Sequence, residues 1–289
     1  MIRSIWKNDP AYPALLREIP DPPERLYAEG KDPDQGPVIA VVGSRRASRY
    51  GLQVAHWLAA ELASSGLTVV SGLARGIDAA AHRGALSVGG STIAVMGCGL
   101  DICYPAGHRS LFNQIAEQGC LISEHRAGTP PLAHHFPVRN RIIAGISLGV
   151  VIVEGVPNGG AMITARLAME FGREVFAVPG AVHSTGSLGP HLLIRDGARL
   201  AGSAAQILED LGISLVPRPE QEPPTLHPDE QRLMEGLQAE PELLDVIARR
   251  VRMPPSTATA ILIKLEMKSM VTRYPGGRYS RSVGAALTR

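Results

Sequence analysis

Lysine and cysteine are scarce in this chain of 289 residues, which holds four of the former and three of the latter. Cys98, Cys103 and Cys120 are odd in number and lack the paired spacing of a zinc site, so we expect reduced thiols instead of disulfides or metal ligands. No stretch approaches the ~20 apolar residues of a membrane span, and the N-terminus lacks the apolar middle of a secretory signal. The sequence therefore predicts a cytoplasmic protein without a metal site or membrane contact.

Two common nucleotide-binding motifs are also missing. After Gly43 the next glycine is Gly51, so the G-x-G-x-x-G of dinucleotide-binding folds is absent. The second expected strand ends at Ser71 and Gly72, where such folds place an acid for a ribose hydroxyl. The phosphate loop G-x-x-x-x-G-K-[ST] does not occur either. We therefore expect neither a NAD-dependent enzyme nor an ATPase, and no cofactor.

Charge is nearly balanced, with a formal net charge of +2. A hydrophobic content of 45% is enough for one large core and a second small domain. Residues 226–289 carry ten Lys and Arg against seven Asp and Glu, so the rest of the chain is close to neutral. A polyanion site in the larger part must therefore be a local patch and not a broad basic field.

From residue 38 onward, short β-branched runs alternate with helical patterns. Runs of this kind are typical of parallel strands buried on both faces and joined by crossover helices. The runs are VIAVV, LTVV, STIAVM, CLIS, GVVIVE and EVFAV, and helices are expected at 48–64, 77–88, 107–118, 138–147, 160–171 and 203–211. Residues 38–212 are thus predicted to form a doubly wound α/β domain.

The two flanks differ from this pattern. Residues 1–37 are rich in proline and charge and hold too few apolar residues for their own core, so we expect an N-terminal extension packed on the main domain. Residues 213–225 are proline-rich, which is typical of a semi-rigid linker. Residues 226–289 show three helical patterns and then two short strands around Gly276 and Gly277, which predicts a winged-helix domain.

Glycines follow three successive predicted strands. Gly43 comes after the first, the stretch SGLARGID at 71–78 after the second, and MGCGLD at 96–101 after the third. Open parallel sheets bind ligands outside the carboxyl ends of their strands, and glycine lets backbone N–H groups approach a phosphate closely. The turns therefore indicate a phosphate-binding edge, although folding alone explains any single one of these glycines equally well.

Arginines gather in the same loops, beside one aromatic residue. Guanidinium groups pair with phosphate oxygens, and an aromatic face stacks a base at ~1–3 kcal/mol, a combination suited to single-stranded nucleic acid. A solvated first helical turn for Arg139 and Arg141, and a core position for Phe136, are the plainer alternatives. The set is Arg45, Arg46, Arg75, Arg109, Phe136, Arg139, Asn140 and Arg141.

Six motifs in order resemble those of the DprA/Smf family of DNA-processing proteins. They are VGSRRASRYG, SGLARGIDAAAH, TIAVMGCGLDICYP, HFPVRNRIIAGIS, FAVPG and SLGPHLLIRDGA, within a collinear match over about 11–212. The resemblance implies an extended Rossmann-like domain that binds single-stranded DNA and protects incoming strands in natural transformation. It also implies loading of the RecA recombinase, and a binding protein instead of an enzyme.

The resemblance also assigns contact residues for single-stranded DNA. They are Gly43, Ser44, Arg45, Phe136, Arg139, Asn140 and Arg141, and the loop residues Arg46, Ser71, Gly72 and Arg109 complete the predicted contact set. Many relatives carry lysines where this chain has Ala106 and Ala133, and Arg109, His134 and His135 are candidates to replace them. Gly159 and Gly160 stand where relatives have Ser-Gly, which puts a hydroxyl contact there in doubt.

Family members dimerise through the end of the α/β domain, and the corresponding positions here are His191, Ile194 and Leu200. The resemblance therefore implies a homodimer. Two paired DNA sites would raise the effective concentration and let one assembly hold two strands, which is consistent with annealing of complementary strands. Core positions for Ile194 and Leu200 are the alternative.

The last 64 residues leave two partners open. The predicted recognition helix begins near Ser256 and exposes Thr257, Thr259 and Lys264, with Arg273 and Arg278 on the wing. Such a helix suits a DNA major groove, but winged helices also contact proteins, so duplex DNA and a protein partner are equally expected.

An enzyme of the LOG phosphoribohydrolase type is the competing hypothesis, since its sheet is similar. Those enzymes carry PGGxGTxxE, whereas this chain has PNGGAMITA without the glutamate at that spacing. Asp78 and His82, four residues apart, would share a helix face open to metal or general-base chemistry, but an acid in a first turn is ordinarily a dipole partner. Glu154 is expected to be a buried carboxylate without a chemical role.

Overall fold

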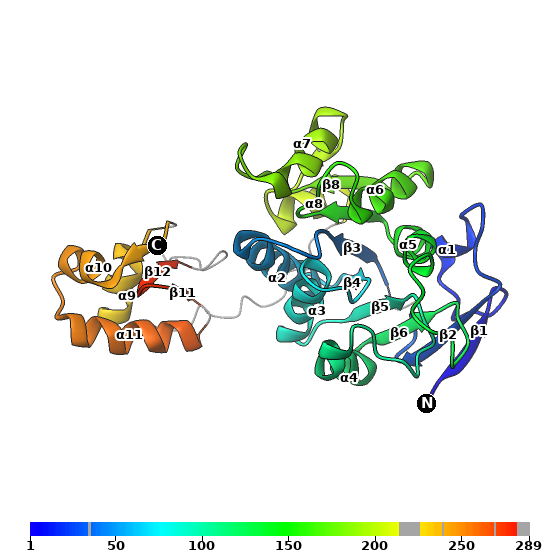
Figure 1. Cartoon of the computed structure of the whole chain (residues 1–289), viewed down its shortest axis with the longest axis horizontal. Coiled ribbons are helices and arrows are strands. Elements are labelled where there is room, and N and C mark those ends of the chain that lie inside the picture. The colour runs from blue at the N-terminus through cyan, green and yellow to red at the C-terminus, as the bar shows by residue number, and fades with distance from the viewer. Residues whose placement is uncertain (34–35, 214–225, 239, 269, 282–289) are drawn as a thin grey trace. The chain divides into compact units, whose positions relative to one another are not determined.

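The computed structural model describes residues 1–33, 36–213, 226–238, 240–268 and 270–281 (Figure 1). It divides into two compact units, Met1–Pro217 and Arg218–Arg289. Nearly all of the expected linker, residues 214–225, lies outside the described residues. In the described part of the chain, none of the helices has the length and apolar character needed to cross a membrane.

A nine-stranded sheet forms the first unit, in the order β1-β2-β6-β5-β4-β3-β7-β8-β9. The pairs from β6 to β9 in this order are parallel, whereas β1 pairs with β2, and β2 with β6, in antiparallel fashion. The strands are β1 (Arg3–Trp6), β2 (Arg25–Gly30), β3 (Val38–Val42), β4 (Thr68–Ser71), β5 (Thr92–Met96), β6 (Cys120–Ser123), β7 (Gly149–Ile152), β8 (Glu174–Ala177) and β9 (Arg199–Leu200).

Helices cover both faces of this sheet (Figure 1). On one face α1, α5, α6 and α7 contribute to the larger apolar cluster, and on the other α3 and α4 contribute to a second cluster. The helices are α1 (Ala14–Arg17), α2 (Arg49–Ser64), α3 (Ile77–Ser87), α4 (Arg109–Gln118), α5 (His135–Ile146), α6 (Gly160–Glu170), α7 (Leu188–Arg195) and α8 (Ala204–Asp210). The predicted α/β fold with a Rossmann-like parallel sheet is confirmed.

The chain reverses its direction of travel across the sheet between β3 and β7. Strands β3 to β6 are added toward one edge, and β7 to β9 toward the other. The loop after β3 and the loop after β7 therefore lead in opposite directions across the sheet. Such folds form a crevice between these two loops, at the carboxyl ends of the strands. We call the edge formed by the carboxyl ends of β3 to β7 the rim.

The N-terminal residues extend the sheet instead of only packing on it. Leu26 of β2 and Leu16 of α1 are fully buried in the larger cluster. The buried Tyr12 hydroxyl donates to the Pro23 carbonyl at 2.7 Å. The segment thus shares the core of the domain.

The second unit is a winged helix, as its sequence predicts. It contains α9 (Pro228–Gly236), α10 (Leu244–Arg250), α11 (Pro255–Met267) and a sheet of β10 (Glu242–Leu243), β12 (Arg278–Arg281) and β11 (Val271–Tyr274). Gly276 and Gly277 turn the hairpin with φ of 78° and 68°, a conformation that favours glycine. Thr257 and Lys264 are exposed on α11, as expected.

Leu26→Ala tests whether the N-terminal segment shares the core. Removing a fully buried leucine leaves a cavity, so we expect the free energy of unfolding to fall by about 2–5 kcal/mol. Both tryptophans, Trp6 and Trp57, lie in the first unit, so their fluorescence follows its urea unfolding. The control is Leu132→Ala, at a residue 44% exposed. Equal losses in the two variants would contradict a shared core.

Candidate nucleic-acid interface

The loop after β3 is held tightly where it leaves the sheet. Ser44 N–H donates to the Glu154 carbonyl at 2.8 Å, and Ile77 N–H donates to the Ser44 carbonyl at 3.2 Å. A Cβ on Gly43 would lie 2.6 Å from Ile77 Cγ1, so only glycine fits there. The exposed side chains of Arg45 and Arg46 follow directly. The fold therefore presents two guanidinium groups at the rim.

Glu154, in the loop after β7, holds Ser48, the N-cap residue of helix α2. Its buried carboxylate accepts from Ser48 N–H at 2.8 Å and from Ser48 Oγ at 2.5 Å, while Ser48 Oγ accepts from Gly51 N–H at 3.0 Å. A Cβ on Gly51 would collide with this carboxylate. The expected buried carboxylate is present, and its hydrogen bonds serve the first turn of α2.

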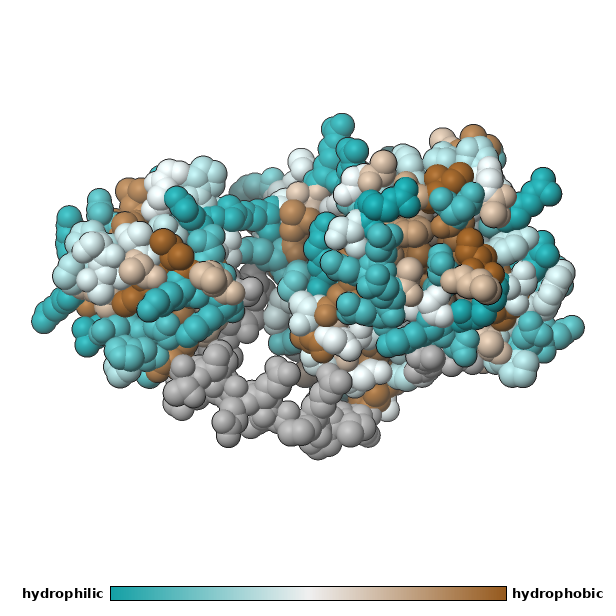
Figure 2. Space-filling model, turned by 90° about the horizontal axis from the view of Figure 1, so that it is seen from below, coloured by the Kyte–Doolittle hydropathy of each residue, from teal (hydrophilic) through white to brown (hydrophobic). Residues whose placement is uncertain are grey.

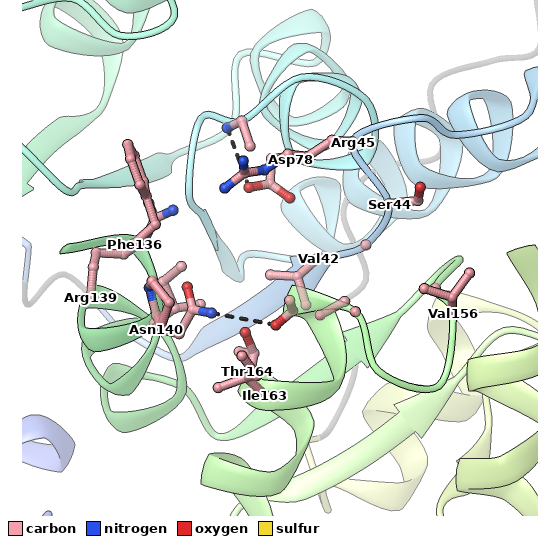
Figure 3. A pocket seen from close by; sticks show the side chains of 18 residues that line it. Val42, Ser44, Arg45, Asp78, Phe136, Arg139, Asn140, Val156, Ile163 and Thr164 are labelled. Carbon is pink, nitrogen blue, oxygen red and sulfur yellow. Dashed lines mark hydrogen bonds between the residues drawn. The ribbon is translucent and has the colours of Figure 1, made fainter. Parts of the chain in front are cut away.

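Two neighbouring cavities open along the rim. The first, of about 390 Å³, lies at the β3–β7 switch and is shown in Figure 3. The second, of about 480 Å³, extends toward β5 and includes Arg46, Arg75 and Tyr104 in its lining. Both are lined by Arg45, Ala74, Phe136 and Arg139. Because they share these four residues, the two cavities lie next to each other.

Phe136 lies between the two cavities, in the first turn of α5. Its ring centroid is 5.5 Å from Arg45 Cζ and 5.3 Å from the Tyr104 ring centroid. The ring packs over Gly97, where an added Cβ would lie 3.0 Å from Phe136 Cδ1. Phe136 is partly exposed, so an arginine and an aromatic ring lie against each other at the rim.

Arg139 is placed differently from its sequence expectation as a DNA contact. It is 3% exposed and donates to the carbonyls of Gly72, at 2.8 Å, and Val95. Burial lowers its pKa to about 10, and the Asp78 carboxylate partly offsets that shift. Burial likewise raises the pKa of Asp78, against the opposing charge of Arg139. Arg139 therefore acts inside the protein, beneath the rim.

Arg141 is likewise engaged internally. Its guanidinium makes a two-pronged pair with Glu124, at 3.1 and 2.7 Å, and contacts Asp21 at 3.3 Å. The side chain is 14% exposed. A phosphate would have to displace these carboxylates. We therefore propose neither Arg141 nor the buried Arg139 as a DNA contact.

Of the four other predicted contact residues, two are buried next to the backbone, one lines a cavity and one lines neither cavity. Ser71 and Gly72 are buried; Ser71 Oγ donates to the Val41 carbonyl at 2.7 Å, and a Cβ on Gly72 would lie 2.5 Å from the Arg139 guanidinium. Asn140 lines the first cavity and its Nδ2 is 3.4 Å from the Gly160 carbonyl. Arg109 is exposed at the start of α4 but lines neither cavity.

Two rim residues were missing from the predicted contact set. Arg75 is exposed in the loop after β4, and Tyr104 is 41% exposed in the loop after β5. Both line the second cavity. Arg75 was visible in the sequence as a loop arginine, whereas nothing in the sequence places Tyr104 beside Phe136.

The groups considered for catalysis or metal binding are buried. His82 Nδ1 lies 2.7 Å from Thr92 Oγ1, and burial lowers the pKa of this histidine to about 3. Asp78 accepts from the N–H groups of Gly72 and Ala74 at 3.2 and 3.3 Å. Across the described ranges, no cluster of three or more His, Cys, Asp or Glu could hold a metal ion.

The expected dimer residues occupy one end of the sheet. Leu200 is 49% exposed on the edge strand β9, whereas Ile194 is partly buried against the larger cluster. His191 Nε2 is 3.1 Å from the Gly180 carbonyl and lines a surface hollow of about 250 Å³. Leu200 is thus the most exposed of the three.

Comparison with known proteins places this chain in a family. The model for DNA recombination-mediator protein A matches residues 3–212, and the DprA winged helix domain model matches residues 217–277. Protein Smf of Escherichia coli is 41% identical over 276 residues, covering 92% of this chain and 74% of that protein. Protein Smf of a Synechocystis strain is 37% identical, covering 96% and 79%.

Two solved structures are similar in fold and sequence. DNA processing protein A from Streptococcus pneumoniae has a TM-score of 0.70 and 43% identity, covering 72% of this chain and 74% of that one. The Helicobacter pylori protein, described for its single-stranded DNA binding mode, has a TM-score of 0.66 and 29% identity, covering 73% and 95%. With its sheet, its rim and its winged helix, this chain belongs to the DprA/Smf family of DNA-processing proteins.

Proposed function

We propose that the rim of this chain binds single-stranded DNA. The observation that carries the proposal is the position of Arg45 against the Phe136 ring, between two consecutive cavities. A guanidinium pairs with a phosphate and an aromatic face stacks a base, so the two together hold one nucleotide of an unpaired strand. The binding mode described for the Helicobacter pylori relative supports the same ligand class.

A strand suits this rim better than a free nucleotide does. The exposed residues Arg45, Arg46 and Arg75 all line the second cavity, and Arg45 also lines the first, so several phosphates of one strand could be met along the rim. A single mononucleotide needs fewer. The nearby carboxylates are already engaged, Glu154 with Ser48 and Asp78 with backbone N–H groups, which supports binding over catalysis. The revised contact set is Gly43, Ser44, Arg45, Arg46, Arg75, Tyr104, Phe136 and Asn140.

Family membership supports the wider role that the sequence implies. We extend the proposal to protection of incoming DNA in natural transformation, to loading of RecA, and to annealing by a cytoplasmic homodimer. Faster RecA assembly on single strands in the presence of this protein would support loading.

A titration of a fluorescently labelled oligonucleotide and its duplex, with and without residues 226–289, tests the ligand class. Tight binding of the single strand by both forms supports the proposal, and equal affinity for the duplex contradicts it. Loss of duplex binding alone on truncation would assign duplex DNA to the winged helix. If duplex binding is unchanged by truncation, a protein partner for that domain is favoured.

Arg45→Ala should weaken single-stranded DNA binding about tenfold or more, because a charged hydrogen bond is lost. Losing one phosphate contact should also make the slope of log affinity against log salt shallower by ~0.7. Arg83→Ala, at an exposed residue of α3, removes the same charge away from the rim and should change neither value. An unchanged slope for Arg45→Ala would remove Arg45 from the contact set.

Phe136→Ala should weaken binding about five- to 150-fold, the loss of one stacking contact worth ~1–3 kcal/mol. Since no charge is removed, the salt slope should stay at its original value, in contrast to Arg45→Ala. Measurements at several salt concentrations on the same oligonucleotide distinguish the two effects. Full affinity in the Phe136→Ala protein would rule out base stacking here.

Leu200→Glu should yield a monomer by light scattering, because it places a charge on the exposed edge of the sheet. Met169→Glu, at a residue 51% exposed on α6, is the matched control and should remain dimeric. A dimer in both variants would exclude β9 from the interface.

A further inference from the structure

We infer that Trp6, Arg25 and Tyr27 form a second contact point for the unpaired strand, beyond the two cavities. We call these three residues the platform. Its role would be to stack a base of the segment that leaves the Arg45–Phe136 contact. The inference rests on the proposed function, since it adds a site for the same polymer.

The platform is a cation between two aromatic rings. Arg25 Cζ lies 4.8 Å from the centroid of the Trp6 ring and 4.6 Å from that of the Tyr27 ring. Trp6 nevertheless remains 52% exposed, an unusual amount for the largest aromatic side chain. The guanidinium orients the indole while much of its surface stays open, and every base has a face that can stack there.

Sheet register places the platform on the same edge as the cavities. Trp6, the last residue of β1, pairs with Arg25, the first residue of β2. Tyr27 pairs with Ser123, the last residue of β6, and β6 is parallel to its neighbour β5. Trp6 and Arg25 therefore lie at the carboxyl-end edge, which continues past β6 to β1. The platform prolongs the line that begins at Arg45.

The charge at the platform suits a polyanion. Two carboxylates lie near the platform and both are engaged: Asp9 accepts from Trp6 N–H at 2.6 Å, and Glu24 pairs with Lys7 at 3.8 Å. Arg25 has no carboxylate at ion-pair distance in the described part of the chain. Exposed Arg126 is in the loop after β6, the strand that lies between β5 and β2 in the sheet. An uncompensated guanidinium beside a stacking surface can meet the phosphate of the base that it stacks.

The platform lies too far from Arg45 for a short oligonucleotide to reach both. The path from β3 to β1 crosses β4, β5, β6 and β2, which is five strand spacings or about 24 Å. At the 3.4 Å rise of a stacked strand this distance corresponds to about seven nucleotides. An unstacked strand covers more than this rise per nucleotide, so the platform should affect long oligonucleotides and not the shortest ones, which reach only the Arg45–Phe136 contact.

Tryptophan fluorescence reports the contact directly. Trp57→Phe leaves Trp6 as the one tryptophan, and Trp57 lies on α2 with its indole donating to Glu61 at 2.7 Å. Oligothymidylate of about 20 nucleotides should quench Trp6, and one of about four nucleotides should bind without quenching it. Binding of the long oligonucleotide with unaltered fluorescence would overturn the platform and leave the Arg45–Phe136 site standing.

Affinity gives an independent measure. Trp6→Ala should weaken binding of the long oligonucleotide at least about fivefold and leave the short one unchanged, while Trp6→Phe should retain most of the affinity. Equal affinities of Trp6→Ala and the unaltered protein for the long oligonucleotide would also refute the platform. A chain that binds neither length would overturn both this inference and the proposed function, so the two failures are distinguishable.

Discussion

The buried guanidinium of Arg139 is the constraint on which the rim depends. It joins α5 to the ends of β4 and β5 through the carbonyls of Gly72 and Val95, next to the Asp78 carboxylate. A buried charge without such partners would cost several kcal/mol, so α5 is fixed in this register over the sheet. Phe136 lies one turn earlier on the same helix and is held above the loops that present the arginines. The surface contact is therefore positioned by a buried guanidinium and the two carbonyls that it meets beneath the rim.

Most of the fold could be predicted from the sequence because its central strands are buried on both faces. Each apolar run from Val38 to Val178 corresponds to one of β3 to β8. The edge strand β1 and its neighbour β2 were missed, since one face of each is partly exposed and their sequences alternate instead of forming an apolar run. Helix α5 begins at His135, three residues earlier than expected, because Pro137 fits the first turn of a helix.

The site was less predictable, because its chemistry depends on which way each arginine points. Arg45, Arg139 and Arg141 look alike in the sequence, yet one is exposed, one meets buried carbonyls and one pairs with Glu124. Those partners are distant in the chain and come together only in the folded sheet. The glycine-rich turns, by contrast, were readable, since Gly43 and Gly72 are required by close backbone and side-chain packing. The platform joins β1 to β2, which the sequence pattern did not reveal.

Because of Glu154, the two sides of the crevice differ in charge. Its carboxylate already satisfies the positive end of α2, whereas α6 starts at Gly160 with no acidic residue in its first turn and no side-chain cap. Both helices begin at the β3–β7 switch, but Glu154 lines a separate hollow beside Tyr50 whereas Gly159 and Gly160 line the first cavity, so an anion there would be attracted on the α6 side and repelled on the Glu154 side. A DNA strand bound in the crevice would therefore lie closer to α5 and α6, and the Tyr50 side of the entrance would stay free of DNA.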